Sequence, residues 1–163
     1  MKISPAIKGI ITAALMTGII LLIYNMGKNA DTRLQYAVYG IYALGIVWTL
    51  VAFRQTASFT GTFGNPFNQG CKCFIVVTLI IALFYVILNY SHPEFLEESS
   101  KIYKEQLLSE KNGSKTPDEI EEATRSYKKG YNMAVVYGSI FGYLIIGVAV
   151  TAAISVFLIK RKE

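Results

Sequence analysis

The chain has 163 residues, of which 53% are hydrophobic and 17% charged, with a formal net charge of +5 and a mean hydropathy of +0.40. Four windows carry no Asp, Glu, Lys or Arg, and each is long enough to cross a hydrocarbon core of about 30 Å as a helix: residues 9–27, 34–53, 73–93 and 130–159. A soluble chain of this length cannot bury four such segments, which excludes a soluble globular enzyme, a disulfide-rich secreted domain and a nucleic-acid binder.

The sequence predicts one membrane domain over residues 1–163, with the lipid bilayer as its surroundings. Its first span covers about residues 7–26 and its second about residues 35–53. The short polar segment 27–31 between them predicts a tight turn and antiparallel neighbours. The first apolar stretch is longer than the core of a signal peptide, and no clear cleavage site follows it, so we expect it to remain as a span.

The third span is expected at about residues 73–90, after a polar loop at 55–71. Asn65-Pro66 has the residues of a helix start, so the helix is expected to begin before the membrane. The span is rich in β-branched residues, but an open strand edge is not tolerated in lipid, so a helix is favoured. Phe59, Phe63 and Phe67 recur every four residues and either rest on the lipid surface or anchor an ordinary loop.

A charged segment at about residues 93–130, here called the arm, precedes a fourth span at about 131–159. Pro93 should kink the junction where the third span leaves the membrane, and Thr116-Pro117-Asp118-Glu119 has the pattern of a capping box. Two apolar stripes should face each other across a turn at Asn112-Gly113, Leu96, Tyr103 and Leu107 on one side and Ile120, Ala123 and Tyr127 on the other. The predicted fold is therefore an all-α, integral membrane, four-transmembrane-helix bundle with an extramembrane helical hairpin between the third and fourth spans.

Basic residues indicate the orientation. Short segments on one side carry seven of them against Glu163 alone: Lys2, Lys8, Arg54, Lys72, Lys160, Arg161 and Lys162. The other side has nine basic and ten acidic residues, spread mostly along the arm. Dense basic flanks favour the cytoplasm. We therefore expect both termini to be cytoplasmic and the arm to lie outside the cytoplasm.

Three stretches resemble an uncharacterised bacterial membrane family catalogued as DUF 4199. They are the Gly-Asn-Pro-Phe-Asn-Gln-Gly run at 64–70, the span through 78–83, and the Tyr-Ser-His-Pro-Glu-Phe-Leu exit at 90–96. The resemblance covers nearly the whole chain. It implies a short four-span inner-membrane protein of Gram-negative bacteria with no assigned activity, and it supplies no functional residues.

Little in the sequence points to chemistry. No Asp, Glu, Lys, Arg or His is expected inside a span, which argues against a proton-coupled exporter with a membrane carboxylate. No nucleophile–base pair is visible, so we expect no enzyme, no catalytic residue and no cofactor. Cys71 and Cys73 are too few for a closed zinc site, and we expect reduced, inert thiols, although a soft metal shared with a second chain stays open. His92 is expected to be an ordinary interfacial residue.

Small residues and tyrosines form the remaining patterns. Gly138 and Gly142 make a G-x-x-x-G motif, and Gly9 with Ala13 makes a similar pair in the first span; such faces pack either within the monomer or in a homodimer. Deep hydroxyls need partners in a dry bundle. We expect these hydroxyls to form either an outward-opening polar pocket or interhelical contacts. The tyrosines concerned are Tyr39, Tyr42, Tyr85, Tyr137 and Tyr143.

Function is expected in the arm. Phe95, Ile102 and Leu108 fall beside its paired stripe, and exposed apolar side chains at a membrane edge suggest a partner surface. The favoured function is a non-enzymatic accessory subunit that binds another membrane or periplasmic protein. The alternative is a small transporter or channel for a neutral or amphiphilic solute, which a hydrated cavity among the tyrosines would favour.

Overall fold

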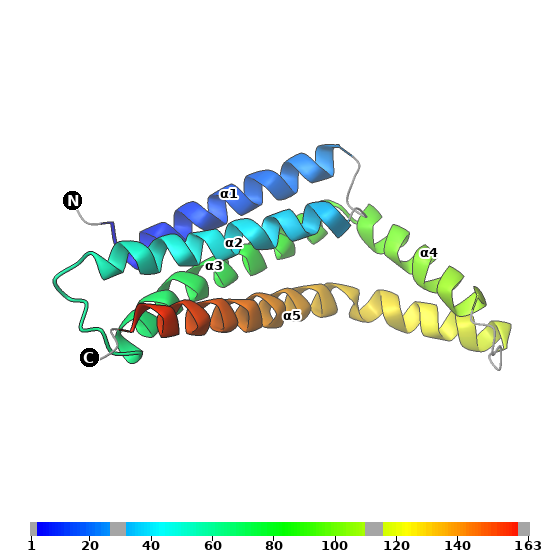
Figure 1. Cartoon of the computed structure of the whole chain (residues 1–163). Coiled ribbons are helices and arrows are strands. Elements are labelled where there is room, and N and C mark those ends of the chain that lie inside the picture. Colours follow the sequence, from blue (N-terminus) through cyan, green and yellow to red (C-terminus); the bar gives the residue numbers. More distant parts are fainter. Residues whose placement is uncertain (1–2, 27–31, 110–115, 160–163) are drawn as a thin grey trace. The chain divides into compact units, whose positions relative to one another are not determined.

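The computed structural model describes residues 3–26, 32–109 and 116–159. It contains five helices, shown in Figure 1: α1 (Pro5–Asn25), α2 (Thr32–Arg54), α3 (Gly64–Ser91), α4 (Glu94–Ser109) and α5 (Pro117–Leu158). The described residues include no strand. The turn predicted at Asn112-Gly113 lies outside the described residues.

Four of the helices are long and apolar enough to cross a membrane: α1, α2 from Tyr36 onward, α3 and α5. Large apolar side chains point outward from them, and Phe157 is 83% exposed. Such outward-facing side chains suit a lipid environment, where they need no protein partner. The predicted all-α fold with four spans is therefore confirmed.

Two helices start at least nine residues earlier than the hydropathy pattern alone predicts. The third starts at Gly64 rather than near residue 73, because Asn65 and Pro66 favour a helix start in the preceding polar loop. α5 runs unbroken for 42 residues from the arm into the fourth span. This is about twice the length that a bilayer requires, so the arm and the span share one helix.

The chain divides into two compact units. The first comprises Met1–Ile81 with Ser139–Glu163, and we call it the bundle unit; the second is Ala82–Gly138, the arm unit. In the bundle unit the core is built from fully buried side chains that include Met16, Tyr42, Ile46, Leu50 and Val77.

Close helix contacts in the bundle unit occur at glycines. A Cβ added at Gly45 would collide with Thr12, one at Gly70 with Thr151, and one at Gly147 with the hydroxyl of Tyr42. Because lipid tails are as apolar as the side chains, spans associate mainly through such tight packing and through hydrogen bonds. These glycines therefore fix the spacing of the helices.

In the arm unit, Pro93 separates α3 from α4. The backbone N–H of His92 makes the last hydrogen bond of α3, to the carbonyl oxygen of Leu88 at 2.9 Å. Pro93 has no N–H to continue the series, and α4 starts at Glu94. At the junction where a kink is predicted, the chain therefore ends one helix and starts another.

The predicted capping box at the start of α5 is also confirmed. The backbone N–H of Thr116 donates to Glu119 Oε2 at 2.6 Å, and the backbone N–H of Glu119 donates to Thr116 Oγ1 at 3.3 Å. At the start of a helix, these two backbone N–H groups would otherwise lack a hydrogen-bond acceptor.

Replacing this cap tests its contribution. We expect Thr116→Ala to cost about 1 kcal/mol of local helix stability, because the side-chain acceptor of the Glu119 N–H is lost. Hydrogen exchange at the first turn of α5 should accelerate, while exchange in α1 stays unchanged. Thr116→Ser keeps the acceptor and serves as the control; equal exchange in both variants would contradict the capping role.

Candidate functional site

The arm is held together by contacts between α4 and the first part of α5. The rings of Tyr103 and Tyr127 stack with centroids 4.4 Å apart and planes 11° apart. Lys128 Nζ binds both carboxylate oxygens of Glu97, at 2.7 and 2.8 Å. Ser99 Oγ donates to the hydroxyl of Tyr131 at 3.2 Å. The predicted meeting of the two stripes is thus present at Tyr103 and Tyr127.

The three candidate partner residues lie on α4. Ile102 is 48% exposed and Leu108 is 63% exposed, whereas Phe95 is half-buried with its ring 5.8 Å from that of His92. Phe95 and Ile102 are seven residues apart and share a face, while Leu108 lies about 120° further around the helix. Phe95 and Ile102 therefore form one edge, here called the arm edge, and Leu108 stands apart from it.

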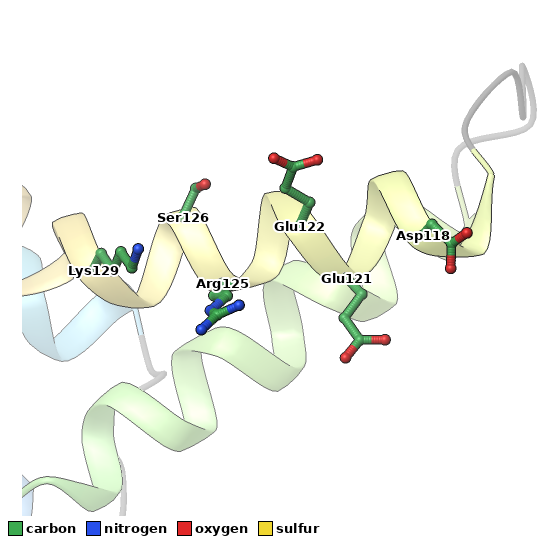
Figure 2. A pocket seen from close by; sticks show the side chains of 6 residues that line it. All are labelled: Asp118, Glu121, Glu122, Arg125, Ser126 and Lys129. Atoms are coloured by element: carbon green, nitrogen blue, oxygen red, sulfur yellow. The ribbon is translucent and has the colours of Figure 1, made fainter.

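The outer face of α5 in the arm is charged. A shallow hollow is lined by Asp118, Glu121, Glu122, Arg125, Ser126 and Lys129. Figure 2 shows that all six side chains leave the same helix, with Glu122 and Ser126 on one side and Glu121 and Arg125 on the other. All six residues belong to one helix, which cannot enclose a ligand. We therefore interpret this face as a solvent-exposed polar surface of the arm.

The five candidate tyrosines do not form one cluster. Tyr42 is fully buried in the bundle unit and donates its hydroxyl to the carbonyl oxygen of Tyr143 at 2.9 Å. The ring of Tyr143 lies 5.3 Å from that of Tyr42 and 5.5 Å from that of Tyr39. These three tyrosines pack together as interhelical contacts.

The other two belong to the arm unit. Tyr85 is half-buried with its ring 5.9 Å from that of Phe84, and Tyr137 is exposed. Tyr137 lines a mostly apolar groove of about 230 Å³ together with Val86, Asn89, Tyr90, Asn132, Met133 and Val136. This volume is below the range of roughly 300–1,000 Å³ that is usual for small-molecule sites.

The candidate packing residues differ from one another. A Cβ at Gly9 would lie 2.8 Å from the carbonyl oxygen of Cys73, and Ala13 is fully buried. At Gly138 and Gly142, by contrast, a Cβ would meet nothing within 4 Å. The G-x-x-x-G motif therefore makes no close contact within the described chain, and the tight position on α5 is Gly147.

The burial of one charged residue near the start of α1 was not predicted from the sequence. Lys8 belongs to α1, is only 7% exposed, and has its Nζ 5.4 Å from the ring centroid of Trp48. Lys8 lies in the first turn of the candidate span Pro5–Asn25, and the predicted span of about residues 7–26 also includes it, so the expectation that no charged residue lies inside a span does not hold at this position. The signal available in the sequence was the Ser-Pro pair at Ser4-Pro5, a helix start one turn before Lys8.

Cys73 is fully buried near Lys8, while Cys71 is half-buried, and neither forms a disulfide. The hydroxyl of Thr49 lies 3.3 Å from Cys73 Sγ and 2.9 Å from the carbonyl oxygen of Gly45. His92 Nδ1 lies 2.7 Å from Glu94 Oε1 at the start of the arm. Among the described residues, no three His, Cys, Asp or Glu side chains are placed to hold a metal ion.

These features define an integral membrane protein with four apolar helices and a charged arm. A model of a family described as "Protein of unknown function (DUF4199)" matches residues 6–160. The chain belongs to this family, as its sequence resemblance implied. No curated protein and no solved structure matches it.

Proposed function

We propose that this protein is a non-enzymatic accessory subunit of the bacterial inner membrane whose arm binds an extracytoplasmic protein. The proposal is supported by the contacts that hold the arm together and by the apolar side chain that they leave exposed. Its tyrosine stack and its Glu97–Lys128 ion pair order a charged segment, and Ile102 is left exposed beside the stack. An ordered segment with an exposed apolar edge is suited to binding a partner.

The charge of α4 indicates the chemistry of the partner. The helix carries four glutamates and only two lysines. Complementary potentials guide association between proteins. We therefore expect the partner to present an apolar surface bordered by basic residues, with the arm edge of Phe95 and Ile102 at the centre of the contact.

The packing of the bundle unit supports a binding protein over a transporter. Tyr42, Tyr143 and Tyr39 contact each other directly, and the hydroxyl of Tyr42 has a backbone partner. A solute pathway through these tyrosines would require their rings and hydroxyls to face water instead.

Charging the arm edge tests the proposed function. We expect Ile102→Glu to reduce co-purification of the partner in mild detergent by at least about tenfold, because a desolvated carboxylate opposite an apolar surface costs more than about 1.4 kcal/mol. Membrane insertion and the protease resistance of the arm should be unchanged, since Ile102 lies outside the tyrosine stack.

Lys101→Gln is the matched control, because it changes the net charge by the same amount at a neighbouring exposed position. It should retain most of the partner. If Ile102→Glu keeps a folded arm and full partner binding, the proposal is wrong. If the same variant exposes the segment between Ser99 and Arg125 to protease, Ile102 instead stabilises the arm, and this too would contradict the proposed role.

A further inference from the structure

The buried Lys8 is the feature of the bundle unit that packing does not explain. Its side chain lies against the ring of Trp48, with Nζ 5.4 Å from the ring centroid. Burying an ammonium group is unfavourable unless an anion or several hydrogen-bond acceptors replace its hydration. An aromatic face attracts the charge but offers no acceptor for its three N–H donors.

No carboxylate in the described part of the bundle unit can supply that anion. The unit contains only two acidic residues in sequence, Asp31 and Glu163, and both lie outside the described residues. Within the described chain, Lys8 Nζ makes neither an ion pair nor a hydrogen bond to an oxygen atom. We therefore expect the ammonium group of Lys8 to bind an anionic group from outside the described residues.

The position of Lys8 indicates where this anion comes from. Lys8 is one turn from the start of α1, and Trp48 is six residues from the end of α2. Trp48 is 43% exposed, and tryptophans are typical of the membrane–water interface. Arg54 is the last residue of α2 and Lys72 is the ninth residue of α3, and both are exposed. A lysine near the start of a span, with further basic residues on the neighbouring spans, is suited to contact lipid phosphates.

We infer that Lys8 and Trp48 form a binding site for a phosphate group, and that its occupant is an anionic phospholipid of the adjoining leaflet. Lys8 Nζ donates to the phosphate oxygens. The exposed part of the Trp48 ring lies against the glycerol and upper acyl chain. A soluble phosphate compound shares the same chemistry, and the experiment separates the two sources.

Trp48 is the only tryptophan of the chain, so its fluorescence reports on this site alone. The full-length protein is reconstituted into phosphatidylcholine vesicles that contain a minor fraction of one lipid brominated near the glycerol end, either phosphatidylglycerol or phosphatidylcholine. Quenching of Trp48 then measures which lipid occupies the site. We expect about a fivefold preference for brominated phosphatidylglycerol, which corresponds to about 1 kcal/mol for one lysine near an anionic membrane surface.

Variants assign this preference to Lys8. Lys8→Gln should abolish it, Lys8→Arg should retain it, and Lys72→Gln, which removes an exposed lysine at the same end, should keep most of it. An unchanged preference in a monodisperse Lys8→Gln protein would overturn the inference. Because Lys8→Arg keeps the positive charge, a preference that is lost in Lys8→Gln but retained in Lys8→Arg results from the lost charge and not from a disrupted fold.

Two further measurements identify other occupants. If inorganic phosphate changes Trp48 fluorescence saturably and removes the lipid preference, the site takes a soluble phosphate compound and the lipid assignment is wrong. If the preference is absent in the wild type and emerges only in Glu163→Gln, an internal carboxylate occupies Lys8, which also overturns the inference. The expected result is a lipid preference that neither inorganic phosphate nor Glu163→Gln alters.

Discussion

Gly147→Ala should destabilise the bundle by about 1–3 kcal/mol, the usual cost of overpacking a tight contact. At this position a Cβ would collide with the hydroxyl of Tyr42 and lie 2.8 Å from the ring of Phe74. Both neighbours are buried, and the hydroxyl donates to the carbonyl oxygen of Tyr143, one turn before Gly147 on the same helix. The methyl group therefore forces either a broken hydrogen bond or a shift of α5. Thermal unfolding in detergent measures the loss.

Gly142→Ala is the matched control on the same helix. A Cβ there meets nothing within 4 Å, and alanine is the better helix former by about 1 kcal/mol. This variant should be neutral or slightly stabilising. Opposite signs for the two substitutions would establish where α5 packs tightly; a loss at Gly142 that equals the loss at Gly147 would contradict the described packing.

Tyr127→Ala should unfold the arm locally, with a loss of about 2–4 kcal/mol of its stability. The substitution removes the ring that stacks on Tyr103 at 4.4 Å and also contacts Tyr131 at 5.9 Å. Loss of a large aromatic side chain from a packed contact is among the costliest single changes. Limited proteolysis should then cleave between Ser99 and Arg125, while the apolar helices stay protected.

Leu108→Ala removes a large side chain that is already exposed and should leave the arm resistant to protease. If Tyr127→Ala remains as resistant as Leu108→Ala, the stack does not stabilise the arm. The same measurement gives the baseline for Ile102→Glu, since it shows what an unfolded arm looks like in the protease assay.

The sequence was sufficient to predict the elements whose causes are local. Charge-free windows defined the four apolar helices, Pro93 ended α3, and Thr116 with Glu119 defined the start of α5. Each depends on residues within a turn or two of one another, so no tertiary information was needed.

Features that depend on which faces meet could not be predicted in the same way. A G-x-x-x-G motif marks a face that allows close approach but does not show whether a helix lies there, and Gly147 is tight because Tyr42 of α2 and Phe74 of α3 reach it. Likewise, the hydropathy pattern places Lys8 at the edge of the first charge-free window and does not show that the ring of Trp48 lies against it. Lateral packing between distant segments decides both cases.

We propose cytoplasmic termini and an arm outside the cytoplasm for this four-span protein, and cysteine accessibility tests this orientation most directly. Cys73 is fully buried and Cys71 half-buried, so both are replaced by alanine and single cysteines are introduced at exposed serines, as Ser58→Cys in the loop between α2 and α3 and as Ser109→Cys at the end of α4. A membrane-impermeant maleimide is then added to cells whose outer membrane has been permeabilised. We predict that Ser109→Cys is labelled at once and that Ser58→Cys is labelled only after the inner membrane is disrupted. Labelling of Ser58→Cys with protection of Ser109→Cys would reverse the orientation, and immediate labelling of both would contradict the odd number of spans between them.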